Sequence, residues 1–240
     1  MRERPLTPKW QLPREATSNM KTIHLVRHGE SAANAGLPTS EPELIPLTPR
    51  GRAQAAQLAQ LLAVRPAAIV TSEYIRAIDT ARPLATRHGL DYSRHALLNE
   101  FVTLDPASVA GTGTKERRPL IDSYWTQGDP RLRMGPGAET FMEFAQRADD
   151  YRPQLDALPH HTVVFGHGMW FAMLLWRTLN FPVADRLSMK SFRQFQIGLP
   201  MPNCAVYELH GPGDGTWRIQ FNAEVSRQMP AVLDPAHAIQ

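Results

Sequence analysis

Short apolar runs recur along the chain, and each gives way to glycine and polar residues. They are TIHLV (residues 22–26), PAAIVTS (66–72) and HTVVF (161–165). Uninterrupted apolar runs of this length, rich in β-branched residues, are typical of strands that are covered on both faces of a sheet. The pattern of DYSRHALLNEF (91–101) predicts part of a further strand.

Helical spacing fills the intervals between these runs. LTPRGRAQAAQLAQLLAV (47–64) predicts a helix with Thr48 as its cap and Pro49 in its first turn. SEYIRAIDTARPLATRHG (72–89) predicts a second helix, which Ser72 caps, Pro83 kinks or interrupts and Gly89 ends. AETFMEFAQRADDYRPQLDAL (138–158) and the apolar segment from Met169 predict two more.

Two remaining segments differ from this alternation. NCAVYELHGPGDGTWRIQF (203–221) predicts two strands joined by a glycine-rich hairpin turn. Residues 102–137 contain glycine, proline and charge without a period, and irregular chain of this length in a compact domain is typical of a lid or binding loop.

Strands that alternate with helices predict an α/β fold, with a mostly parallel central sheet and helices on both faces. A chain of 240 residues is long enough for one full-sized core. We therefore predict a single domain over residues 21–240, with a lid over residues 102–137 that determines substrate specificity. Residues 1–20, which are rich in proline and charge, predict a flexible N-terminal arm.

Composition narrows the choice of partners and compartment. The chain has 26 Lys and Arg residues against 23 Asp and Glu, and these are interspersed without a basic stripe, so we predict no nucleic-acid partner. The longest apolar segment (169–176) is far shorter than the roughly 20 residues that cross a bilayer, so we predict no membrane partner. The single cysteine, Cys204, is read as a core residue and suits a reducing compartment. The protein is expected to be cytoplasmic.

Four cationic or potentially cationic side chains fall where ligands bind in such a sheet. Arg27, His28 and His167 directly follow predicted strands, and Arg76 lies one helical turn past Ser72. Gathering these groups without an anion would cost heavily in repulsion and desolvation. The arrangement predicts a site for a doubly negative group, and phosphate fits best.

The ordered motifs LVRHGES (25–31), TSEYIRAIDTA (71–81), GAET (137–140) and VVFGHG (163–168) resemble the histidine phosphatase superfamily, also called the phosphoglycerate mutase-like family. The resemblance covers nearly the whole chain after the arm and implies the phosphoglycerate mutase-like fold. It implies that His28 is a nucleophile that forms a phosphohistidine, with no metal and no cofactor. The residues that it implies as phosphate ligands are Arg27, Asn34, Arg76 and His167.

A proton must also reach the leaving oxygen and later leave the incoming water. The resemblance implies Glu100, in LLNEF, for this role. The sequence that follows Glu100 departs from the family pattern, so Glu30 and Asp105 stay as further candidates.

Three functions are compatible with these motifs. The first is a phosphomonoesterase, a hydrolase of the histidine acid phosphatase type, acting on a small phosphorylated metabolite. The second is phosphoglycerate mutase-type phosphoryl transfer, which is disfavoured because residues 35–51 lack the Trp- and Gly-containing stretch of the mutases. The third is a non-catalytic module that binds a phosphorylated ligand. The physiological substrate and the oligomeric state are left open.

Other polar residues have plainer interpretations. Glu139 is read as part of the opening turn of a helix, where an acid favours the helix dipole. Trp125 is read either as a lid residue or as local packing. The adjacent His160 and His161 are read as surface or turn residues without a metal, as are His88, His95 and His210. Four arginines of the irregular segment are read as a solvated face, with one or two of them as candidates to contact the non-phosphate part of a substrate: Arg117, Arg118, Arg131 and Arg133.

Overall fold

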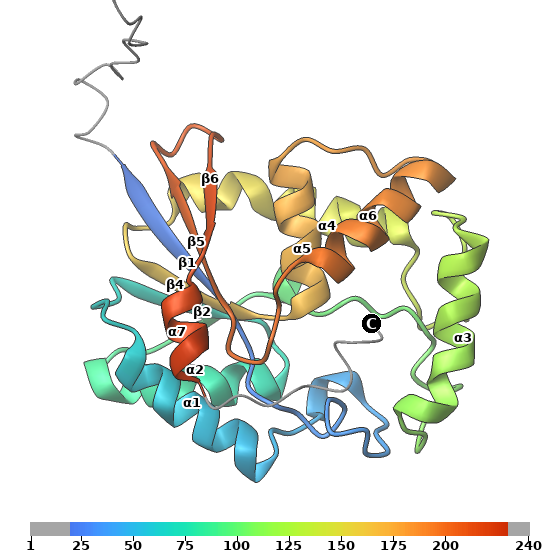
Figure 1. Ribbon diagram of the computed structural model, residues 1–240, viewed down its shortest axis with the longest axis horizontal. Coiled ribbons are helices and arrows are strands. Elements are labelled where there is room, and N and C mark those ends of the chain that lie inside the picture. Colours follow the sequence, from blue (N-terminus) through green and yellow to red (C-terminus); the bar gives the residue numbers. More distant parts are fainter. Residues whose placement is uncertain (1–19, 230–240) are drawn as a thin grey trace, which may run out of the picture.

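A six-stranded sheet forms the centre of the computed structural model, which describes residues 20–229 (Figure 1). The strand order is β3-β2-β4-β1-β5-β6, and within these residues only β5 runs against the others. The predicted mostly parallel α/β fold is therefore confirmed, whereas the predicted arm lies outside the described residues except for Met20. The strands are β1 (Lys21–Arg27), β2 (Ala68–Thr71), β3 (Ser93–Arg94), β4 (Thr162–Gly166), β5 (Val206–Gly211) and β6 (Arg218–Phe221).

Helices cover both faces of the sheet (Figure 1). On one face pack α1 (Pro49–Leu61), α2 (Ile75–His88) and α7 (Ala223–Gln228). On the other pack α4 (Phe141–Ala157), α5 (Gly168–Thr178) and α6 (Arg186–Gly198). Single 3-10 turns form at Pro42–Leu44 and Ala96–Leu98, and α3 (Thr114–Gln127) stands beyond the end of the sheet. In the part of the chain that the structure describes, no helix has the length and apolarity to cross a membrane.

The strands have continuous apolar runs because successive side chains of a strand pack into the hydrophobic cores on opposite faces of the sheet. Val26 and Val163 pack with α1 and α2, whereas Leu25 and Val164 pack with α4 and α5. Successive side chains of a strand point to opposite faces, so both faces require apolar residues. Burial of these strands on both sides supplies much of the hydrophobic stabilisation of the sheet.

The register of the parallel strands brings their carboxyl ends together. Arg27 of β1 lies opposite Gly166 of β4, and Thr71 of β2 lies opposite Phe165. The pairing continues past the strands, because His28 N donates to Gly166 O and Ser72 N donates to Phe165 O. Residues that directly follow these three strands therefore lie side by side.

Most of the predicted helix ends are confirmed. Thr48 caps α1 by accepting a hydrogen bond from Gly51 N, and Gly89 ends α2 with φ of 63°. The prediction for Ser72 is wrong, because α2 begins at Ile75 after a Tyr74 cap, and the Ser72 hydroxyl bonds His167 and Tyr74 N and not an amide of the first turn. Nor does Pro83 interrupt α2, which continues through it.

The segment predicted to be irregular contains a helix, so that prediction is wrong at its centre. Within residues 102–137, α3 forms a capping box in which Glu116 accepts from Gly113 N. The sequence of α3 lacks the apolar period of a helix, because only Tyr124 and Trp125 on it are buried, and it also contains Pro119. The third predicted strand is also reduced to β3, while the hairpin of β5 and β6 is confirmed.

Gly51 lies in the first turn of α1, where the backbone of another loop comes too close for any side chain to fit. A Cβ atom there would lie 1.9 Å from Glu30 O, in the loop that follows His28.

We expect Gly51→Ala to lower the free energy of unfolding by about 1–3 kcal/mol, because the loop and the helix must separate. Urea unfolding measures this change. Gly198→Ala is the control, because a Cβ atom at Gly198 meets nothing within 4 Å, and an equally small effect of both substitutions would contradict the prediction.

Candidate active site

His28 lies at the carboxyl end of β1 with only 4% of its surface exposed. Its Nδ1 donates a hydrogen bond of 2.6 Å to Gly29 O, which places the ring proton on Nδ1. Nε2 therefore carries the lone pair, and it accepts from Arg76 Nε at 3.3 Å. Burial holds the pKa of His28 well below 6.5, and Arg76 and Arg27 lower it further. The ring is a neutral base with its lone pair toward a guanidinium.

His167 follows β4 and is fully buried beside His28. The two rings are 5.2 Å apart between centroids and meet edge to face at 60°. His167 Nε2 lies 2.7 Å from Ser72 Oγ, which also accepts from Tyr74 N. Burial, followed by Arg76, keeps the pKa of His167 well below 6.5. Among residues 20–229, its Nδ1 is buried without a hydrogen-bond partner.

Arg27 and Arg76 bring two guanidinium groups to this pair of rings. Arg27 donates to Met201 O, and Arg76 Nη1 donates to Pro42 O at 2.6 Å. The Arg76 guanidinium also lies over the Tyr74 ring, 4.8 Å from its centroid. Burial lowers the pKa of Arg76 to about 10, and Glu100 is the group that opposes this shift most. The structure thus brings Arg27, His28, Arg76 and His167 together at one rim of the sheet.

Glu100 reaches the same rim from the loop after the 3-10 turn at residues 96–98. Its carboxylate accepts from Phe101 N at 2.9 Å, and from Met169 N and Trp170 N at the start of α5 at 3.2 and 2.9 Å. Burial raises the pKa of the Glu100 carboxyl above 4.5, although these amides and Arg76 pull it down. A carboxyl held in this way can exchange a proton in a partly dry site.

The two further acid candidates are engaged elsewhere. Glu30 accepts from Thr48 Oγ1 at 2.7 Å and forms a salt bridge with Arg50 at 3.5 Å. Asp105 accepts from Ala107 N at 3.2 Å within its own turn. The geometry therefore favours Glu100 of the three acids.

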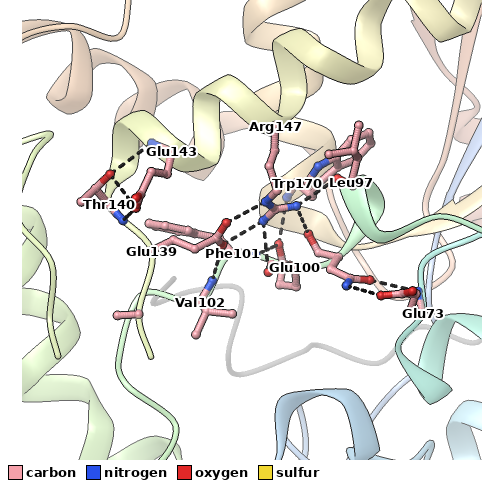
Figure 2. Close-up of polar contacts among 12 residues, drawn as sticks. Glu73, Leu97, Glu100, Phe101, Val102, Glu139, Thr140, Glu143, Arg147 and Trp170 are labelled. Carbon is pink, nitrogen blue, oxygen red and sulfur yellow. Dashed lines mark hydrogen bonds and ion pairs between the residues drawn. The ribbon is translucent and has the colours of Figure 1, made fainter. Parts of the chain in front are cut away.

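A half-buried clamp behind Glu100 holds its loop against α4 (Figure 2). Arg147 donates to the Leu97 and Asn99 carbonyls at 2.9 and 2.8 Å, and forms two hydrogen bonds with Glu139 at 2.6 and 2.8 Å. Glu139 also accepts from Val102 N at 3.1 Å. The reading of Glu139 as part of the opening turn of a helix is wrong, because it precedes the Thr140 cap and pairs with Arg147.

Asn34 lies at the edge of the site with its amide oriented by neighbours. Its Oδ1 accepts from Ser31 N, Ser31 Oγ and Asn203 Nδ2 at 3.3, 3.1 and 3.1 Å. Sequence reasoning overlooked Asn203, Arg147 and Met201 and gave Ser72 a different role. These residues act through contacts between distant segments, so no local motif marks them.

A cavity of about 520 Å³ opens from this rim toward α3. Asn34 and Glu100 form its inner end, and α3 and α6 contribute its outer wall. Trp125 is both buried packing and part of the wall, so its two proposed roles coexist. The reading of Arg117 as solvated is wrong, because its guanidinium binds Thr112 Oγ1 and the carbonyls at the base of α3.

A group of imidazoles lies apart from this site. The ring centroids of His160 and His161 are 3.6 Å apart, and His161 stacks on the buried His24, which lies 3.8 Å from Glu208. His160 is exposed and both residues lie in a turn, so the reading of the pair as surface or turn residues is confirmed. Within the described residues, no set of three or more His, Cys, Asp or Glu side chains has a metal-binding arrangement.

The fold and this rim of histidines and arginines are those of a histidine phosphatase. The sequence profile of the histidine phosphatase superfamily (branch 1) matches residues 23–224, and the chain belongs to that family. It is 31% identical over 230 residues to a protein of Proteus mirabilis (strain HI4320) named probable phosphoglycerate mutase GpmB. The match covers 90% of this chain and 98% of that protein.

Solved structures of similar fold include two phosphatases. A mycobacterial glucosyl-3-phosphoglycerate phosphatase has a TM-score of 0.64 at 24% identity, over 85% of this chain and 97% of its own. A putative alpha-ribazole-5′-P phosphatase from Escherichia coli (str. K-12 substr. MG1655) has a TM-score of 0.65 at 22% identity, over 84% and 95%. The phosphoglycerate mutase-like fold is therefore confirmed.

The neutral state of the paired rings leads to a pH-dependent stability. The unfolded chain binds protons on His28 and His167 near pH 6.5, whereas the folded chain does so only at much lower pH. The free energy of unfolding should therefore fall below about pH 6.5, by at most about 1.4 kcal/mol per pH unit for each ring. Urea unfolding of wild type and His28→Gln at several pH values measures how much of this pH dependence comes from His28. Ring ¹⁵N shifts of the folded protein that titrate with midpoints at or above pH 6.5 would contradict the prediction.

Proposed function

We propose that this protein is a phosphomonoesterase, which hydrolyses a small phosphorylated metabolite through a phosphohistidine on His28. The observation that carries this proposal is the neutral His28, whose unprotonated Nε2 faces Arg76 and lies beside His167. A neutral imidazole nitrogen is a competent nucleophile near neutral pH. The surrounding positive charge suits a dianion that must lie within reach of it.

In the first step, Nε2 of His28 attacks phosphorus and the bond from phosphorus to the ester oxygen breaks. Arg27 and Arg76 hold the equatorial oxygens, whose charge is spread in the transition state. Ser72 accepts from Tyr74 N and so can donate its own proton to His167 Nε2, which leaves the ring proton on Nδ1. Nδ1 of His167 then donates to a phosphoryl oxygen, and the amide of Asn34 donates to another.

Glu100 moves the proton in both steps. Burial raises its pKa and so favours the acid form, which protonates the leaving oxygen as the first bond breaks. In the second step it accepts a proton from water, whose oxygen bonds to phosphorus as the bond to Nε2 breaks. Phosphate leaves, and both Glu100 and His28 return to their starting states. The arginines supply the charge, so neither a metal nor another cofactor is required.

The mutase alternative shares all of these phosphate ligands and differs in the acceptor of the phosphoryl group. The name of the Proteus mirabilis relative supports it, whereas the names of the two structural neighbours support hydrolysis. The stretch between the nucleophile loop and α1 also lacks the Trp- and Gly-containing sequence of the mutases. Incubation with a phosphoglycerate and a bisphosphate primer separates the two, because a mutase yields the isomer and a phosphatase yields inorganic phosphate.

Removal of the nucleophile should abolish turnover. We expect His28→Ala to reduce phosphate release from an aryl phosphate by about 1,000-fold or more, because no other group can take the phosphoryl. Colorimetric phosphate release measures the loss, and a circular dichroism spectrum like that of wild type shows that the variant is folded. Retention of most activity would exclude His28 as the nucleophile.

Replacement of Glu100 should uncouple the two steps. With an aryl phosphate whose leaving group needs no proton, Glu100→Gln should still phosphorylate His28 but hydrolyse it about 100- to 10,000-fold more slowly. Labelled phosphohistidine should therefore accumulate in this variant and not in wild type. With an alkyl ester, wild-type kcat/KM should fall as pH rises through the raised pKa of Glu100, since the acid form is then lost. Turnover equal to wild type would remove Glu100 from the mechanism.

A further inference from the structure

The wall of the cavity beyond Glu100 is largely apolar. Phe101 and Met169 lie beside the acid, and Ile121 and Trp125 of α3 contribute the outer side. Polar side chains also line the cavity, among them Thr103, Thr114, Lys115 and Asp122. On the larger apolar part of the wall the hydroxyl groups of a sugar would find few partners, and a buried polar group without a partner costs free energy. A flat apolar ring would instead replace water against these side chains at a gain.

One cation from α6 completes this wall. The guanidinium of Arg193 lies 4.9 Å from the centroid of the Trp125 ring and donates to Gln196 Oε1 at 2.6 Å. Burial lowers its pKa to about 10, so it stays charged at neutral pH. Within residues 20–229 it forms no salt bridge with a carboxylate.

Two of the neighbouring cations differ from Arg193 in this respect, and the third, Lys115, lines the cavity from an exposed position. Arg117 is occupied by the carbonyls at the base of α3, and Arg118 forms a salt bridge with Asp122 at 3.5 Å. Arg193 is thus a half-buried guanidinium on an aromatic face, in a cavity that is also lined by Glu100 and Asn34. Such a group is suited to a carboxylate or a second phosphate on the substrate.

We propose that the substrate of this phosphatase is a phosphate ester of an aromatic or similarly flat apolar alcohol that carries a second anionic group, and that Arg193 determines this specificity. This inference rests on the proposed function, since it concerns the part of the ester that leaves. The ring lies between Phe101, Met169 and Trp125, and the second anion meets Arg193.

Three esters of primary alcohols test the proposal, because their leaving oxygens have similar basicity. They are 4-carboxybenzyl phosphate, benzyl phosphate and glucose 6-phosphate. Wild-type kcat/KM should decrease in that order, by about tenfold at each step, which corresponds to one charged contact and one buried ring. A preference for glucose 6-phosphate, or equal values for all three, would overturn the proposal without any variant.

Two variants of α6 isolate the charge. Arg193→Met should remove the advantage of 4-carboxybenzyl over benzyl phosphate, and Arg193→Lys should restore part of it. Lys190→Met is the matched control, because it removes one positive charge from an exposed position of the same helix that does not line the cavity. If Arg193→Met lowers kcat/KM equally for both benzyl esters, the residue has a structural role only, and its proposed role in specificity is overturned.

The outcome also separates this inference from the proposed function. If no ester releases phosphate and no phosphohistidine forms, the phosphatase proposal itself fails. If all three release phosphate through His28 without the expected order, only the substrate class is wrong.

Discussion

Positive charge gathered in a buried place is the constraint on which the rest of this structure depends. Arg27 and Arg76 are held near the rings of His28 and His167 by the carbonyls of Met201 and Pro42. The register of β1, β4 and β2 brings these groups together, because parallel strands end at one edge of the sheet. Burial keeps the two rings neutral, which limits the repulsion and leaves a lone pair on His28. A site that pairs a neutral nucleophile with fixed cations suits phosphate chemistry.

Carbonyl anchors and a half-buried ion pair give this rim its rigidity. Gly51 lets the start of α1 touch the loop after His28, so that loop is supported from one side. From the other side, Arg147 and Glu139 tie the loop of Glu100 to α4 (Figure 2). Preorganised groups cost little reorganisation during a reaction, so these remote contacts serve the same end as the phosphate ligands.

The proposed phosphate subsite and the cavity wall beyond Glu100 come from different parts of the fold. The first is built at strand ends, whose positions the sheet determines. The second is built from α3 and α6, which lie beyond the end of the sheet and on its flank (Figure 1). Side chains such as Trp125 and Arg193 can therefore differ between relatives without disturbing the nucleophile. This separation explains how one arrangement of histidines and arginines can serve several substrates.

The sequence alone determined most of the alternation of strands and helices, the mostly parallel sheet and the family, because apolar runs, caps and ordered motifs are local. It did not predict α3, α6 or α7. It did predict the convergence of Arg27, His28, Arg76 and His167, since strand ends in such a sheet share an edge. The tertiary structure decided which side chains of distant segments contact one another. The bond of Ser72 to His167 joins residues 95 positions apart, and Arg147 binds the Leu97 and Asn99 carbonyls from 50 and 48 positions away. Such contacts leave no periodic signal, because each partner satisfies the local pattern by itself.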